Sequence, residues 1–167
     1  MATQSRTDTD ATHLLMADHR KVEELFEKFE KASGTSQKES IALQICNELK
    51  IHTMIEEEIF YPALEGKIDE DLLKEAYVEH DGAKVLVNEI AAGGADEEFY
   101  EAKVKVLQEQ IEHHVEEEEK QRNNMFQQAR AADVDLNALG EAMLRRKEEL
   151  MEQAAAGGLP PAKPSVL

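Results

Sequence analysis

Apolar residues recur along most of the chain at alternating steps of three and four, the spacing of one face of an α-helix. Five segments show this pattern between residues that cap or break helices: about 12–32, 37–64, 69–91, 97–131 and 136–155. No long stretch alternates apolar and polar residues as a β-strand does. The pattern therefore predicts an all-helical protein.

A few residues set the expected helix ends. Asp10 or Thr12 should cap the first helix and Asp96 the fourth, because these side chains can accept a hydrogen bond from free backbone N–H groups. Pro62 lies in the last turn of the second helix and can kink it. The first four helices are long and their connections are short, which favours antiparallel neighbours in an up-down-up-down four-helix bundle.

The predicted domain organisation is simple. Residues 1–11 should be a disordered N-terminus, 12–132 the four-helix bundle, 133–155 an extra C-terminal helix and 156–167 a flexible tail. The tail is expected to be flexible because it contains Pro160, Pro161 and Pro164. The extra helix could either cap the bundle or form a dimer contact.

Composition narrows the possible functions. The 167 residues include 19 basic and 36 acidic side chains, a net charge of −17, which disfavours nucleic acid and anionic membranes as partners. No segment approaches the roughly 20 apolar residues of a membrane helix, and residues 1–10 lack the apolar run of a signal peptide. We therefore expect a cytoplasmic protein, a monomer or weak homodimer. Cys46 is the only cysteine, which excludes an internal disulfide and disfavours a thiolate zinc site.

Polar residues interrupt the apolar face of each of the first four helices. They are His19 in the first helix, His52 and Glu56 in the second, His80 in the third, and His114 and Glu118 in the fourth. Polar groups at core positions destabilise a fold unless something satisfies them. Imidazole and carboxylate together suit iron, manganese or zinc, and His and Glu four residues apart share one helix face. The pattern predicts a metal site built from these six residues.

Helical register separates these residues from their neighbours. His113 shares a stripe with Lys103 and other polar residues, so it should face water while His114 faces the core. Glu57 shares a stripe with Lys50 and Thr53, so we place it outside the site. The acidic run 116–119 should be a solvated face apart from Glu118.

These motifs resemble the hemerythrin-like family, also called the HHE cation-binding domain, over about residues 12–130. The matching pieces are Asp18-His19-Arg20, His52-Thr-Met-Ile-Glu56-Glu57 followed by Phe60-Tyr61-Pro62, Glu79-His80, and His114-Val-Glu-Glu-Glu118-Glu119. The resemblance implies an oxo- or hydroxo-bridged non-haem di-iron centre that binds oxygen, hydrogen peroxide or nitric oxide. It also implies that His19 and His52 hold one iron, that His80 and His114 hold the other, and that Glu56 and Glu118 bridge them.

Two departures from oxygen-carrying hemerythrins bear on the activity. Those proteins have a second histidine four residues from the first on the third helix, whereas Ala76 and Lys84 occupy these positions around His80. Their last motif ends in a carboxylate five residues after its histidine, whereas Glu118 lies four after His114. One iron is therefore left with an open position, or Tyr77 fills it. An open position favours reaction with oxygen or peroxide over reversible carriage.

Several functions remain in competition on this basis. One is a carrier or sensor of oxygen, nitric oxide or iron; another is an enzyme that consumes peroxide or nitric oxide at the same centre. A metal-free helical interaction module does not explain six polar groups in the core. A ferritin-like di-iron oxidase is disfavoured because no histidine has Glu three residues before it.

Overall fold

The computed structural model describes residues 10–167, so most of the predicted disordered N-terminus lies outside the described residues. Its helices are α1 (Ala11–Lys31), α2 (Thr35–Ile55), η1 (Glu56–Phe60), α3 (Tyr61–Leu64), α4 (Glu70–Ala92), α5 (Tyr100–Val115), η2 (Glu116–Lys120), α6 (Met125–Ala131) and α7 (Leu136–Gly157). The elements η1 and η2 are single π-helical turns. Residues 10–167 contain no strand, which confirms the predicted all-helical fold.

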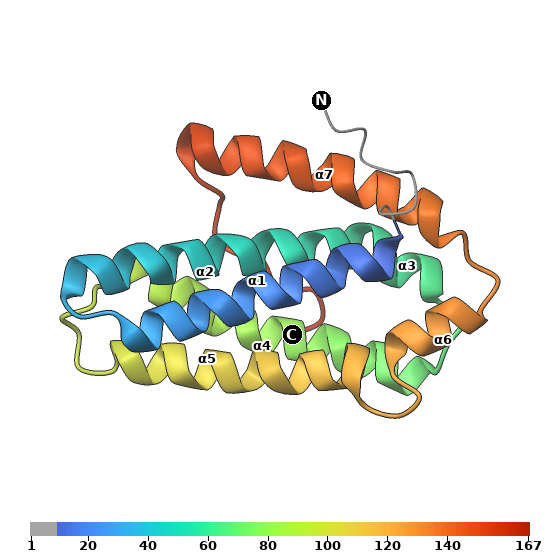
Figure 1. The fold of residues 1–167 in the computed structure, drawn as a ribbon, viewed down its shortest axis with the longest axis horizontal. Helices are drawn as coiled ribbons and strands as arrows, with labels where there is room; N and C mark the ends of the chain where they lie inside the picture. Colours follow the sequence, from blue (N-terminus) through green and yellow to red (C-terminus); the bar gives the residue numbers. More distant parts are fainter. Residues whose placement is uncertain (1–9) are drawn as a thin grey trace.

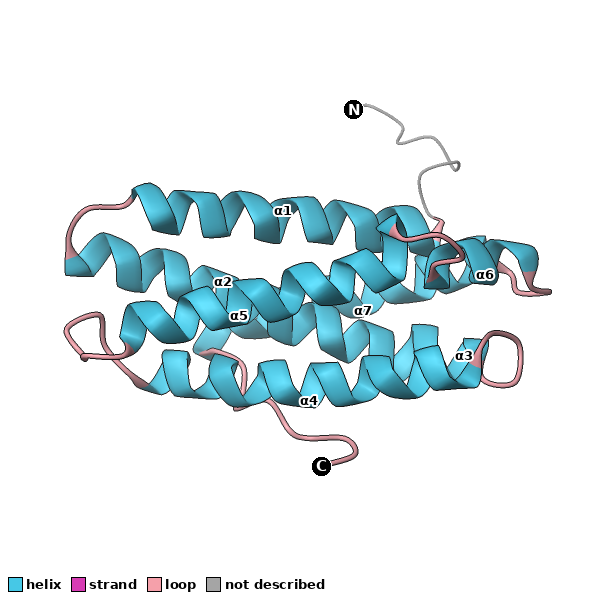
Figure 2. Cartoon of the chain, turned by 90° about the horizontal axis from the view of Figure 1, so that it is seen from below, coloured by secondary structure: helices cyan, strands magenta, loops and turns pink. Residues whose placement is uncertain are grey.

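The long helices lie side by side as a helical bundle (Figures 1 and 2). α1 packs on α2, α2 on α4, and α4 on α5. The extra helix α7 lies along α1 and α2, and the short helix α6 lies at the end of the bundle near α3 (Figure 1). α7 is therefore part of the packed domain. Its buried residues Met143 and Leu150 belong to the apolar cluster at that end of the bundle.

The predicted cap of the first helix is correct, whereas that of the fourth is wrong. Asp10 accepts a hydrogen bond from the backbone N–H of Thr12 at 2.7 Å. The fourth long helix starts at Tyr100 with Phe99 at its N-cap, so Asp96 does not cap it. Residues before Tyr100 form turns, in which the Tyr100 N–H donates to the carbonyl of Glu97 at 3.2 Å. Burial of the Tyr100 ring, which is 1% exposed, fixes where this helix enters the bundle.

The fourth predicted helix is also broken, whereas the sequence pattern predicts one helix over about 97–131. η2 ends at Lys120, and Gln121 has an extended backbone. Asn123 has φ of 58°, a left-handed conformation that asparagine tolerates better than most residues. Asn124 then starts α6 through a capping box with Gln127. These two asparagines therefore end one helix and begin the next.

The turn before Pro62 is π-helical instead of simply kinked. The backbone N–H of Tyr61 donates to the carbonyl of Glu56, five residues earlier. An equivalent bond runs from the Gln121 N–H to the carbonyl of Glu116 at 2.8 Å. In each His-x-x-x-Glu motif the histidine lies at the end of an α-helix and the glutamate in the π-helical turn that follows it, and such turns are frequent at functional sites.

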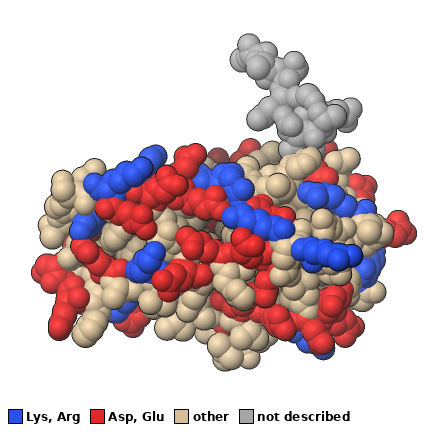
Figure 3. All heavy atoms as spheres, turned by 60° about the horizontal axis from the view of Figure 1, so that its bottom comes forward, with Lys and Arg blue, Asp and Glu red and all other residues tan. Residues whose placement is uncertain are grey.

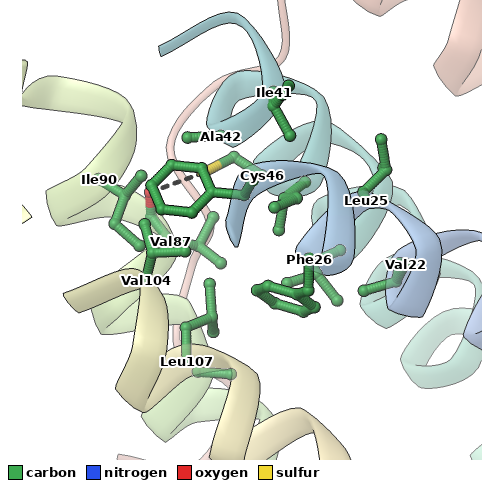
Figure 4. Close-up of a cluster of buried hydrophobic side chains, with 14 of the residues drawn as sticks. Val22, Leu25, Phe26, Ile41, Ala42, Cys46, Val87, Ile90, Val104 and Leu107 are labelled. Carbon is green, nitrogen blue, oxygen red and sulfur yellow. Dashed lines mark hydrogen bonds between the residues drawn. The ribbon is translucent and has the colours of Figure 1, made fainter. Parts of the chain in front are cut away.

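Two apolar clusters fill the interior. One includes Phe26, Val87 and Leu107 and is shown in Figure 4. Cys46 lies in this cluster, where its thiol donates to the carbonyl of Val87 at 3.5 Å, and burial raises its pKa to about 11. The second cluster includes Leu15 and the aromatic rings near α3 and α6. The polar residues of the predicted metal site lie between the two clusters along the helices.

The last residues are held against α4, in place of the flexible tail expected from their prolines. Asn88 and Ala162 exchange two hydrogen bonds of 2.9 and 2.8 Å. Asp81 accepts the backbone N–H groups of Ser165, Val166 and Leu167 at 2.7–2.9 Å. These three N–H bonds outweigh the effect of burial and lower the pKa of Asp81 to about 2. Polar contacts that composition alone does not reveal therefore order this segment.

The outer surface carries mainly acidic charge. Figure 3 shows one face on which Asp and Glu side chains are interspersed with Lys and Arg side chains. Among residues 10–167, no helix combines the length and the apolar character needed to cross a membrane.

Candidate metal centre

The bundle brings all six predicted residues together in its interior. Each is at most 5% exposed: His19 from α1, His52 from α2, Glu56 from η1, His80 from α4, His114 from α5 and Glu118 from η2. Their ligand atoms form two groups, within each of which all atoms lie within 4.8 Å of one another. One group contains His19, His52, Glu56 and Glu118, and the other contains Glu56, His80 and His114. Glu56 belongs to both.

The Nε2 atoms of the histidines face inward. His80 Nε2 and His114 Nε2 are 3.2 Å apart, a separation suited to two ligands on one metal, since metal–nitrogen bonds are about 2.0–2.1 Å long. Within each His-x-x-x-Glu motif the two side chains meet, His52 with Glu56 and His114 with Glu118. The four-residue spacing places both side chains over the same helix face.

Six of the converging atoms are buried and form no hydrogen bond outside the site. They are the Nε2 atoms of His19 and His52 and all four carboxylate oxygens of Glu56 and Glu118, whose close polar contacts are with one another and with His80 and His114. Buried polar atoms left in this state are costly, and natural proteins contain few of them. A bound cation would satisfy all six, so this donor set fits a metal site.

The outward-facing Nδ1 atoms of the histidines are each held by a carboxylate. His52 Nδ1 lies 3.2 Å from Asp18, and His114 Nδ1 lies 3.1 Å from Glu79. His80 Nδ1 lies 2.9 Å from Glu57 Oε1, and His19 Nδ1 lies 3.3 Å from Glu119 Oε2. Such a carboxylate fixes the tautomer in which Nε2 is free to bind a metal and makes that nitrogen more basic.

Two of these carboxylates correct the sequence interpretation. The stripe pattern places Glu57 outside the site and Glu119 on a solvated face, yet both contact a histidine of the site. Both lie in the π-helical turns, directly after Glu56 and Glu118. Lys50 and Thr53, which share the stripe of Glu57, are also buried, so this stripe does not face water. The two Glu-Glu sequences, Glu56-Glu57 and Glu118-Glu119, are the feature of the sequence from which these two carboxylates could have been identified.

The two halves of the site are related by an approximate twofold pattern. In the first half Asp18 precedes His19 and holds His52; in the second Glu79 precedes His80 and holds His114. The second glutamate of each Glu-Glu pair crosses to the opposite half, where Glu57 holds His80 and Glu119 holds His19. Each half therefore depends on the other for the orientation of its histidines.

Burial and mutual contact shift the protonation of the buried groups strongly in the metal-free protein. Burial lowers the pKa of His19 to about 4. Burial and the neighbouring Glu56 carboxylate raise the pKa of Glu118 to about 8. For His52, burial opposes the charge, but Glu56 and Asp18 together raise its pKa to about 10. A negative charge on Glu118 is thus poorly compensated without a cation, whereas His52, with His80 and His114, outweighs burial and lowers the pKa of Glu56.

Tyr61 is the site residue that sequence reasoning missed. Its hydroxyl lies 3.1 Å from His80 Nε2 and 3.4 Å from His114 Nε2, and the side chain is fully buried. Tyr77, the tyrosine considered from the sequence, is partly exposed and packs edge-on against the ring of Tyr61, 5.1 Å between centroids. In the sequence, Tyr61 stands out only as part of the Phe-Tyr-Pro motif, which by itself does not indicate that the tyrosine lies at the site.

The expected orientation of His113 is confirmed. Its side chain is 67% exposed and contacts Glu79 and Glu117, each at 3.3 Å. His114, one residue later, is 4% exposed and points into the bundle.

Fold and site together define a helical-bundle domain whose buried histidines and glutamates fit metal cations. The Hemerythrin HHE cation binding domain matches residues 10–126, and the chain belongs to this family. Among solved structures, it is similar to the crystal structure of a hemerythrin HHE cation binding domain-containing protein from Mycobacterium kansasii, with a TM-score of 0.72 and 24% identity. That likeness covers 90% of this chain and 94% of the other, and at this identity it shows the fold alone. A comparison with curated proteins gave no match.

Proposed function

We propose that this protein holds two iron ions within an up-down-up-down bundle formed by α1, α2, α4 and α5, and binds small ligands there. The ligands would be oxygen, hydrogen peroxide or nitric oxide. One iron would bind His19 and His52, the other His80 and His114, and Glu56 and Glu118 would bridge them.

The observation that carries this proposal is the set of six buried ligand atoms that converge on one another and form no hydrogen bond outside the site. All four oxygens of Glu56 and Glu118 are among them, and a carboxylate with both oxygens free can join two metals. Glu56 already belongs to both groups of converging ligand atoms. Two histidines on either side of two shared carboxylates give the donor count of a two-metal centre, and mixed imidazole and carboxylate donors suit iron.

The size of the site favours small ligands. The cavity lined by the four histidines has a volume of about 20 Å³. That is room for about one water-sized group. An organic substrate would not fit without rearrangement of the helices.

The chain's own residues would prepare the site for such ligands. Four carboxylates fix the histidine tautomers, and the two apolar clusters exclude bulk water. The Tyr61 hydroxyl would lie beside the position held by His80 and His114. Bound iron would supply Lewis acidity and redox chemistry for small ligands.

Metal analysis tests this proposal directly. Protein purified in air should contain about two irons per chain, and its absorption spectrum should change when peroxide or nitric oxide is added. A protein that retains one zinc, and that gains no charge-transfer absorption after iron loading, would refute the two-iron centre.

A second candidate function is turnover of peroxide at the same centre. It is favoured by Tyr61, whose buried hydroxyl can donate a proton or hydrogen bond to a ligand near His80 and His114. The test compares peroxide consumption by iron-loaded wild-type protein and Tyr61→Phe. Equal consumption by wild-type protein and free iron, together with reversible oxygen binding, would leave a carrier or sensor.

A further inference from the structure

The carboxylates that orient the site histidines have partners of their own. Arg20 contacts Glu119, and His113 contacts Glu79. The remaining partners include two residues that lie beyond residue 126, where the family match ends. Lys147 of α7 contacts Asp18, and Ser165 of the C-terminal segment contacts Glu57. Each of these residues is therefore one side chain away from a site histidine.

The contact from α7 reaches His52. Lys147 Nζ donates to Asp18 Oδ1, while Asp18 Oδ2 lies 3.2 Å from His52 Nδ1. The Lys147 side chain is 20% exposed and the Asp18 side chain 5%, so solvent screens this pair only weakly. Met143 and Leu150, on the same helix, are 0% and 1% exposed, and their packing fixes the position of Lys147 over the bundle.

The contact from the C-terminal segment reaches His80. Gly158, with φ of 89°, ends α7 and lets the chain turn back towards α4. Ser165 Oγ donates to Glu57 Oε2 at 2.6 Å, while Glu57 Oε1 lies 2.9 Å from His80 Nδ1. The buried ammonium of Lys84 also contacts Glu57 and donates to Ser165 Oγ at 3.1 Å. Lys84 thus points inward, not out to solvent.

We propose that α7 and residues 159–167 help to position the ligands of the metal centre, with Lys147 and Ser165 as positioning residues. Lys147 orients Asp18 against His52, and Ser165 orients Glu57 against His80. One residue of the C-terminal region thereby acts on each half of the site. The inference rests on the proposed metal centre.

The expected effect follows from the hydrogen bonds. Losing a carboxylate that holds a metal-bound histidine typically lowers metal affinity 10- to 100-fold. Lys147 and Ser165 act one step further out, so we expect about 3- to 10-fold for each, below that range. The histidine whose support is lost should also bind with altered geometry, which changes the absorption spectrum of the iron-loaded protein.

Adjacent basic residues on α7 provide a matched comparison. Arg146 forms an ion pair with Glu58 at 2.8 Å, and Glu58 contacts no site histidine among residues 10–167. Lys147→Met and Lys147→Gln should weaken iron binding in competition with a chelator and shift the absorption spectrum, while Arg146→Met should do neither. Lys147→Arg should keep the iron affinity and the absorption spectrum of the wild type, because its side chain also places a cation beside Asp18.

The C-terminal contact is tested in the same way. Ser165→Ala should weaken iron binding, and Ser165→Thr should preserve it by keeping the hydroxyl. Melting temperatures of the chelated variants separate a loss of fold stability from a loss of metal affinity. A purely structural role predicts that chelated Lys147→Met melts lower while its iron affinity and spectrum match those of Arg146→Met.

The outcomes separate the two proposals. Unchanged iron affinity and spectrum in both Lys147→Met and Ser165→Ala would overturn the positioning role and leave the metal centre intact. Wild-type protein that binds no iron would overturn the metal centre and this inference together. Weakened binding in Lys147→Met, its rescue by Lys147→Arg and an unaffected Arg146→Met would support the inference.

Discussion

Replacing Glu118 by glutamine should stabilise the protein without metal and weaken it with metal. Glu118 is fully buried, and its oxygens form no hydrogen bond outside the cluster of site residues. Burial and the nearby Glu56 carboxylate raise its pKa from 4.5 to about 8. Its ionised form is therefore disfavoured in the folded, metal-free protein, and the neutral amide of Glu118→Gln removes that cost.

The pH dependence gives the magnitude. Between pH 5 and 8 the unfolded chain loses the Glu118 proton while the folded chain largely keeps it, so stability falls as pH rises. At about 1.4 kcal/mol for each pKa unit, this amounts to about 3 kcal/mol over that interval. His52, with its pKa raised to about 10, loses stability with rising pH above about 6.5. His19, with its pKa lowered to about 4, gains stability as pH rises from about 4 to 6.5, below the range in which His52 loses it, so that summed over pH 5 to 8 the two changes are opposite in sign and similar in size.

Urea unfolding with a chelator present, followed by circular dichroism, measures the effect. Between pH 5 and 8, wild-type protein should lose about 3 kcal/mol more of its unfolding free energy than Glu118→Gln loses. Glu116→Gln is the control, because the Glu116 side chain is 56% exposed in the same π-helical turn. With iron present, wild-type protein should be more stable than Glu118→Gln, because the amide cannot replace a bridging carboxylate. A Glu118→Gln protein that is less stable than wild type at pH 8 without metal would refute this reasoning.

The remaining predictions use independent measurements. Chelated wild-type protein should melt lower than loaded protein, since ligand at a hundredfold excess over its dissociation constant stabilises the folded state by about 2.7 kcal/mol; identical melting curves would contradict this. Elemental analysis should show that His114→Ala loses metal and that His113→Ala, altered at a 67% exposed side chain, retains it; equal losses would count against the site. If the Tyr61 oxygen binds iron, an iron–tyrosinate absorption band should vanish in Tyr61→Phe and persist in Tyr77→Phe; the opposite pattern would reinstate Tyr77. A thiol reagent should modify Cys46 only on unfolding, because the thiol is 1% exposed and its pKa is raised to about 11; fast reaction of folded protein would show that this cluster opens.

The inward-facing residues could be identified from sequence because regular helices separate them. His114 and His113 differ by one position, and the apolar residues before them show which side faces the core. Polar residues on a core stripe are unusual enough to stand out. The same logic identified His19 and His80 from single gaps in their helices. In each case the inference required only the helical period and the cost of burying polar groups.

That logic failed where contacts between helices or a break in the helix decide the outcome. Glu57 and Glu119 contact His80 and His19 on other helices, and such contacts do not follow from the stripe of a single helix. The end of η2 and the left-handed Asn123 likewise interrupt a pattern that reads as one continuous helix. The order of the C-terminal segment depends on Asp81, whose three N–H partners lie more than 80 residues away. Tertiary contacts of this kind leave no periodic signal.

The approximate symmetry of the site is broken by a hydroxyl group that only one of its halves carries. Phe126 stacks on His19, with centroids 5.9 Å apart and planes 6° from parallel, while Tyr61 stacks on His80 at 5.2 Å and 29°. Both rings shield a histidine from water, but only Tyr61 adds a hydroxyl, which faces His80 and His114. If two metals bind, each position has two histidines, and the phenol is present beside only one of the two positions. A small ligand that needs a hydrogen bond or a proton would therefore be directed to the position between His80 and His114.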